Sequence, residues 1–92
     1  MIIRISGEDQ YRLEEQKTAE LNELDNAVVA ACEGGDEAGF KRTFGALLDY
    51  VRANGQRIAD DELAGSDLIL PPPDLSFAEA GEQFTGEGLI PD

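Results

Sequence analysis

Two stretches with helical periodicity, at residues 15–33 and 37–54, are separated by only three residues. Glycine suits the C-terminus of a helix and aspartate caps the N-terminus of the next one, so the linker Gly34-Gly35-Asp36 predicts a tight turn. So short a connection makes the two helices antiparallel neighbours. Their apolar residues recur three or four positions apart, as in helices that bury one face: Leu21, Leu24, Val28 and Ala31, then Phe40, Phe44, Leu47, Leu48 and Val51.

Gly39 and Gly45 lie inside the second predicted helix. Each costs about 1 kcal/mol relative to alanine in a helix interior. The first helix is rich in small residues (Ala27, Ala30, Ala31). We therefore expect close approach of the two helices to offset the cost of these glycines.

The N-terminal residues 1–13 predict a β-hairpin. Ile2, Ile3 and Ile5 are β-branched and favour a strand, and the segment 6–9 (Ser-Gly-Glu-Asp) supplies turn chemistry. Alternation then resumes with Tyr11 and Leu13 on one face. A lone hairpin is marginal in water, so we expect it to pack on the helix pair.

The remainder of the chain predicts an extended strap at residues 56–75 and a short helix at 77–85. The prolines at 71–73 enforce an extended path, and Ile58 or Ile69 is placed to add a third strand beside the hairpin. Ser76 and Glu79 have the spacing of a helix capping box. The fold class is therefore α+β, with residues 1–92 forming a single domain.

The charge balance limits what this domain can bind. Twenty carboxylates against seven basic side chains give a net charge of −13, and there is no histidine. Such a field repels nucleic acids and anionic lipid, so neither direct membrane insertion nor nucleic-acid binding is expected. A salt-rich cytoplasm and a GC-rich genome explain this acidity equally well.

Catalysis is poorly supported by the sequence. Without histidine there is no Ser–His or Cys–His pair and no histidine metal site, and a thin core is a bad place to build a cleft for paired carboxylates. The acidic residues Asp60, Asp61, Glu62 and Asp67 lack the spacing of an EF-hand loop. We expect no enzyme activity, no catalytic residue, no metal and no cofactor.

The cellular compartment is inferred from three features. The longest aliphatic run, residues 27–32, is far shorter than the ~20 residues that cross a bilayer. The start lacks the pattern of an export signal, and the single cysteine, Cys32, cannot form an internal disulfide. We expect a cytoplasmic protein in which Cys32 is a small buried hydrophobe rather than a reactive thiol.

The aliphatic, proline-stiffened segment around residues 68–73 is the predicted recognition surface. Prolines reduce the conformational entropy lost on docking. The alternative is a strap that seals the domain's own core, and both hold if alternate side chains face opposite ways. The predicted partner-binding residues are Asp67, Leu68, Leu70, Pro71, Pro72 and Phe77.

Several blocks, spread in order over nearly the whole chain, resemble the PspA-associated protein family, PspAA. They are Met1-Ile2-Ile3-Arg4-Ile5, Gly7-Glu8-Asp9-Gln10-Tyr11, Leu21-Asn22-Glu23-Leu24-Asp25, Gly35-Asp36-Glu37 with Phe40, Asp60-Asp61-Glu62-Leu63, Ser66-Asp67-Leu68-Ile69-Leu70-Pro71-Pro72 and Gly86-Glu87-Gly88-Leu89-Ile90-Pro91. Two positions depart from the family pattern, which usually has glycine where Asp9 stands and a better helix former at Gly81.

The resemblance implies a non-enzymatic adaptor or regulator of PspA, a helical membrane-remodelling protein, in a phage-shock-like envelope-stress response. The chain would then reach the membrane only through that partner. The alternative is an acidic decoy that occupies the basic surface of a transcription regulator. Neither the oligomeric state nor the direction of regulation follows from the sequence.

Overall fold

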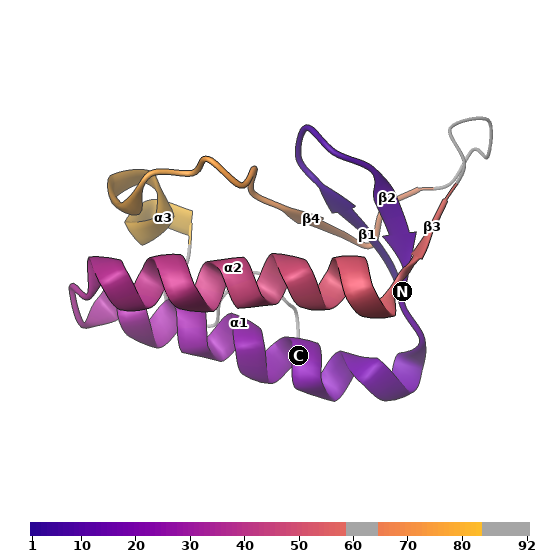
Figure 1. Cartoon of the computed structure of the whole chain (residues 1–92), viewed down its shortest axis with the longest axis horizontal. Helices are drawn as coiled ribbons and strands as arrows, with labels where there is room; N and C mark the ends of the chain where they lie inside the picture. The colour runs from indigo at the N-terminus through magenta and orange to yellow at the C-terminus, as the bar shows by residue number, and fades with distance from the viewer. Residues whose placement is uncertain (59–64, 84–92) are drawn as a thin grey trace.

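The computed structural model describes residues 1–58 and 65–83. Two long helices, α1 (Thr18–Glu33) and α2 (Glu37–Asn54), lie side by side and antiparallel. A small sheet and the short helix α3 (Phe77–Gln83) lie above α2 in Figure 1, at its opposite ends. The predicted α+β class, with a hairpin packed on a helix pair, is confirmed.

The turn between the long helices is built by the residues that predicted it. Gly35 has φ +69, a left-handed conformation that glycine adopts without strain. The Asp36 N–H donates to the Ala31 carbonyl at 2.9 Å and the Gly35 N–H to the Cys32 carbonyl at 3.2 Å, which closes α1. The Asp36 side chain then accepts from the Gly39 N–H at 2.9 Å and caps α2.

The start of the first helical segment differs slightly from the prediction. Residues Glu15–Lys17 form a 3-10 turn before α1 begins at Thr18. The Tyr50 hydroxyl of α2 donates to the Lys17 carbonyl at 3.0 Å, which fixes this turn against the second helix.

In the part of the chain that the structure describes, the sheet has four strands in the order β3-β2-β1-β4. β1 pairs antiparallel with β2 to form the predicted hairpin, and it pairs parallel with β4 on its other side. The expectation of a third strand is confirmed for Ile69, which lies in β4, while Ile58 follows a further short strand, β3. The strands are β1 (Ile2–Ile5), β2 (Gln10–Arg12), β3 (Gln56–Arg57) and β4 (Leu68–Leu70).

Alternation along β1 and β4 decides what the sheet buries. Ile3 and Ile5 of β1 and Leu70 of β4 are fully buried, and Leu68 is nearly so. They face the helices because successive side chains of a strand point to opposite faces. Ile69, between the two leucines, is 60% exposed.

Residues 71–76 leave the sheet and run along α2 to α3 (Figure 1). The predicted cap of α3 is present: the Ser76 hydroxyl accepts from the Glu79 N–H at 3.2 Å and donates to the Glu79 carboxylate at 2.9 Å. The described part of α3 ends at Gln83, so the predicted end at residue 85 lies outside the described residues. The same holds for the predicted strap between residues 59 and 64.

Candidate functional site

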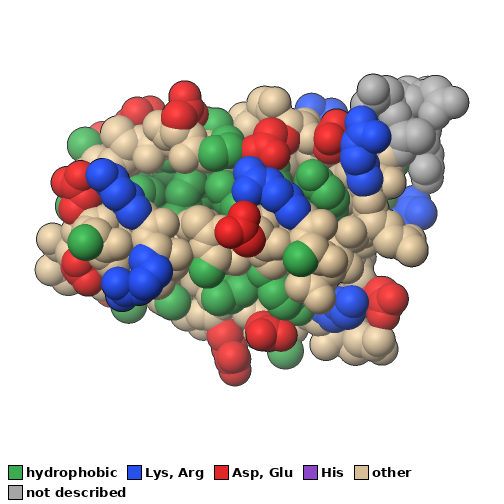
Figure 2. All heavy atoms as spheres, viewed as in Figure 1, with side chains coloured by type: hydrophobic (Ala, Val, Ile, Leu, Met, Phe, Trp, Pro, Cys, Tyr) green, Lys and Arg blue, Asp and Glu red, His purple; other side chains and the backbone are tan. Residues whose placement is uncertain are grey.

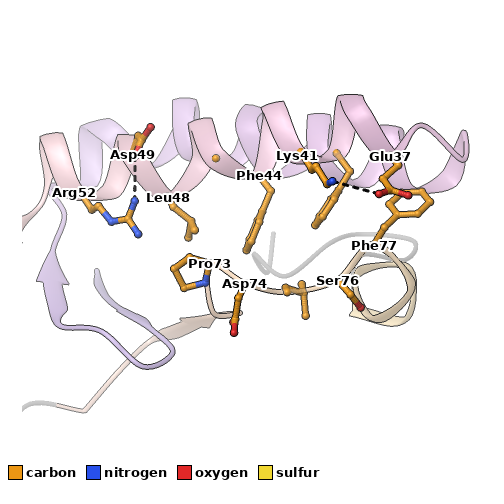
Figure 3. A pocket seen from close by; sticks show the side chains of 13 residues that line it. Glu37, Lys41, Phe44, Leu48, Asp49, Arg52, Pro73, Asp74, Ser76 and Phe77 are labelled. Atoms are coloured by element: carbon orange, nitrogen blue, oxygen red, sulfur yellow. Dashed lines mark hydrogen bonds and ion pairs between the residues drawn. The ribbon is translucent and has the colours of Figure 1, made fainter.

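A groove with a volume of about 530 Å³ lies between α2 and residues 73–77. Hydrophobic side chains gather along its bottom (Figure 2), and polar and charged groups form its rim. The apolar lining residues are Phe40, Phe44 and Leu48 of α2 and Pro73, Leu75 and Phe77 of the opposite wall. Phe40, Phe44, Leu48 and Leu75 are buried, whereas Phe77 is half-buried and Pro73 exposed. Figure 3 shows Phe44 and Leu48 pointing from α2 toward the segment that carries Pro73.

The spacing of the α2 residues explains the groove's floor. Phe40, Phe44 and Leu48 recur every four positions and therefore form one ridge along the helix. The rings of Phe40 and Phe44 stack with centroids 5.3 Å apart. The Phe77 ring of α3 meets Phe40 at 5.7 Å in a tilted arrangement, which holds α3 against the start of α2.

Two ion-pair clusters lie at opposite ends of the groove (Figure 3). At one end Lys41 lies 3.4 Å from the Glu37 carboxylate, with both side chains well exposed. At the other end Arg52 contacts Asp49 at 3.1 Å and the Glu8 carboxylate of the hairpin turn at 2.6 Å. The hydrogen bond to Glu8 raises the pKa of the Arg52 guanidinium, which is protonated at physiological pH in any environment.

The wall opposite α2 carries charge of a single sign. No lysine or arginine follows Arg57 in the sequence. The segment and helix that form this wall carry Asp74, Glu79 and Glu82, and all three are exposed. Asp74 lines the groove and makes no hydrogen bond or ion pair with any residue of 1–58 or 65–83. The groove is therefore acidic on this side.

Gly45 lies midway along the α2 side of the groove. We expected Gly39 and Gly45 to allow close approach of α1, and for Gly45 this is wrong. Apart from the neighbouring residues and backbone of α2 itself, no heavy atom of the described residues lies within 4 Å of the Cβ that alanine would add at Gly45. Gly39 has a local reason instead, because a Cβ there would collide with the Asp36 carboxylate that caps α2.

The six predicted partner-binding residues differ in burial and in whether they line the groove. Leu68, Leu70 and Pro71 are buried, so their side chains belong to the domain's own core. Pro72 and Phe77 are half-buried, and Phe77 alone of the six lines the groove. The Asp67 carboxylate accepts from the Ile2 N–H at 2.8 Å and so helps to join β4 to β1. Their role in partner binding stays a prediction.

Neither the acidic residues considered as a metal site nor Cys32 adds a second candidate site. Asp60, Asp61 and Glu62 lie outside the described residues, and within 1–58 and 65–83 no cluster of three or more metal-ligating side chains occurs. Cys32 is half-buried against the core. Burial, and then the charge of Glu33, raise the pKa of its thiol and disfavour the reactive thiolate.

Neither long helix of the described chain combines the length and the apolar character that a bilayer-crossing segment requires.

These features define a small acidic α+β domain with a groove along one helix. The chain belongs to the PspAA family: the family model described as PspA-Associated protein matches residues 1–92, the whole sequence. No curated protein and no solved structure matched it. The family assignment thus agrees with the resemblance seen in the sequence blocks.

Proposed function

We propose that this protein is a non-enzymatic acidic adaptor or regulator that binds PspA in a phage-shock-like response. The observation that carries this proposal is the match of the PspA-associated family model to residues 1–92. The groove along α2 supports it, because an apolar hollow with a charged rim suits a docking surface for another protein. No part of the proposal requires a metal or a cofactor.

Electrostatics shapes how such an adaptor reaches a membrane. A net charge of −13 is repelled by an anionic leaflet, which attracts basic segments by about 1 kcal/mol per lysine or arginine. In this proposal the adaptor is cytoplasmic and reaches the membrane only by binding PspA. The proposed partner is a helical membrane-remodelling protein. The charge of the adaptor would then limit how closely the PspA assembly packs on lipid.

Flotation with anionic liposomes tests this route to the membrane. We expect the protein to float only when PspA is present. Flotation of the protein alone on anionic liposomes would contradict the proposal. Neutral liposomes with PspA serve as the control, because they separate recruitment by the partner from attraction to lipid charge.

Direct binding to PspA is tested by calorimetric titration at low and high salt. An apolar groove contact keeps most of its affinity at high salt, whereas an acidic decoy that occupies a basic surface loses affinity steeply as salt screens the charges. Absence of any heat or co-elution with PspA under both conditions would refute the adaptor role. Loss of binding at high salt alone would favour the decoy.

A further inference from the structure

Gly45 is a poor helix former in the middle of a long helix, and nothing inside the described chain explains it. Gly39 serves the Asp36 cap, but the space where a side chain would stand at Gly45 is open. Gly45 is half-buried and lines the groove, directly after Phe44 and three residues before Leu48. A missing side chain lets a second backbone approach closely at that point.

The length and shape of the groove fit a helix. The lining residues of α2 run from Glu37 to Arg52, and a rise of ~1.5 Å per residue makes this about 22 Å, or roughly four helical turns. Phe40, Phe44 and Leu48 form the buried bottom of the groove, and the accessible apolar surface above them comes from Gly45, Pro73 and Phe77. A helical segment of about 15 residues would span the groove from end to end.

The charges of the groove define the polar side of such a helix. On the α2 side, Lys41 and Arg52 are each paired with acidic neighbours. On the opposite side, Asp74 lies at the outer rim of the groove with its carboxylate directed away from α2 (Figure 3), and the exposed Glu79 and Glu82 of α3 lie beyond the lining residues. A helix seated here is therefore complementary if it turns lysine or arginine toward residues 74–82.

We propose that the groove takes an amphipathic helix of the partner, with its apolar stripe on the accessible surfaces of Pro73 and Phe77, its backbone crossing α2 at Gly45, and basic side chains facing Asp74. This rests on the proposed function, since the partner whose helix docks is PspA. The inference adds to the proposed function the docking site on this protein, and the secondary structure and charge pattern of the partner segment that binds there.

The test compares two glycine-to-alanine variants by titration with full-length PspA. Gly45→Ala fills the proposed crossing point, whereas Gly81→Ala makes the same change in α3, where a Cβ also meets nothing and the groove is not lined. Both variants should raise the thermal midpoint, because alanine is the better helix former. Gly45→Ala should weaken PspA binding by about tenfold or more, the effect of forcing a methyl group into a packed contact, and Gly81→Ala should leave it unchanged.

A second pair of variants tests the basic side of the partner helix. Asp74→Lys in the groove and Glu23→Lys on the exposed face of α1 change the net charge equally. We expect Asp74→Lys to weaken binding by at least about fivefold more than Glu23→Lys, because like charges across an interface are unfavourable. Equal effects of the two variants would overturn the proposed orientation.

The outcomes separate the inference from the proposed function. PspA binding that Gly45→Ala leaves intact overturns the docking site while the adaptor role stands. No PspA binding by the wild-type protein overturns both. Light scattering on the protein alone adds one further outcome: a dimer that Gly45→Ala dissociates would assign the groove to a second copy of this chain and refute the proposal.

Discussion

Glu8 in the hairpin turn and Arg52 in the last turn of α2 form a two-point ion pair. Arg52 Nη2 lies 2.6 Å from Glu8 Oε2, and its Nε donates to Glu8 Oε1 at 3.2 Å. This pair ties the sheet to the helix that forms the groove. About one third of each side chain is exposed, 35% for Arg52 and 30% for Glu8. Water and salt therefore reach the contact.

A double-mutant cycle should show a modest coupling between these two residues. We expect Glu8→Gln and Arg52→Met to interact by about 0.5–1 kcal/mol in the free energy of unfolding at low salt, and by clearly less in 1 M NaCl. Urea unfolding of the wild type, both single variants and the double variant provides the measurement. A coupling that does not change with salt would contradict an ionic origin.

The ion pair between Asp9 and Arg57 makes stability depend on pH. Arg57 Nε donates to the Asp9 carboxylate at 2.8 Å, and this hydrogen bond lowers the pKa of Asp9. Because the folded pKa is below the unfolded one, the pair stabilises the fold fully above about pH 4. That contribution is lost as the pH falls through the lowered folded pKa.

Thermal melts from pH 7 to pH 2.5 check this sign. Asp9→Asn should melt at a lower temperature than the wild type near neutral pH, and the gap should close in acid. Asp74→Asn is the matched control, since it removes one negative charge from an exposed carboxylate without a described partner. A constant gap between Asp9→Asn and the wild type at every pH would show that Asp9 acts through something other than its charge.

Asp25 is a buried carboxylate on α1, with a relative exposure of 0%, and it has an interaction partner. Asp25→Ala would remove a buried interaction and leave a small cavity, so we expect a loss of about 1–3 kcal/mol in the free energy of unfolding. Asn26→Ala, on the exposed next position of α1, should stay within about 0.5 kcal/mol of the wild type. Urea midpoints of the two variants measure the difference, and equal midpoints would be inconsistent with a buried role for Asp25.

The alternation along β4 predicts opposite outcomes for neighbouring substitutions. Leu70 is fully buried and pairs with Ile5, whereas Ile69 is 60% exposed. Leu70→Asp would bury an unpaired charge, which costs more than the few kcal/mol of stability that a small domain has. We expect it to abolish cooperative unfolding, while Ile69→Asp loses less than about 1 kcal/mol. Far-UV circular dichroism during heating distinguishes them, and a folded Leu70→Asp would show that Leu70 is not core.

The local features of this fold are predictable from the sequence because neighbouring residues encode them. The linker Gly34-Gly35-Asp36 predicts the turn between α1 and α2, and Ser76 with Glu79 predicts the start of α3. The hairpin follows from the β-branched residues before Gly7 and the alternation after it, and the φ of +79 at Gly7 requires the conformational freedom of glycine. Each signal lies within a few residues of the structure it specifies.

The parallel pairing of β1 with β4 and the groove are not predictable in this way. The register that sets Ile3 beside Leu68 depends on tertiary packing, and no local pattern specifies it. The groove exists only because residues 73–77 return along α2, and the sequence correctly predicts Phe40 and Phe44 as core residues without showing that a groove lies above them. One available signal was Gly45, a helix-weakening residue within an otherwise regular apolar pattern.

The bond from the Ile2 N–H to the Asp67 carboxylate joins positions 65 apart in the chain. Closing so large a loop is entropically costly and slows folding, whereas the two long helices are sequence neighbours. Because synthesis starts at the N-terminus, β1 cannot pair with the parallel strand β4 until most of the protein has been made. A product that stopped before Leu68 would keep its helical hairpin and expose the bare edge of β1, a surface open to unwanted strand pairing with other chains.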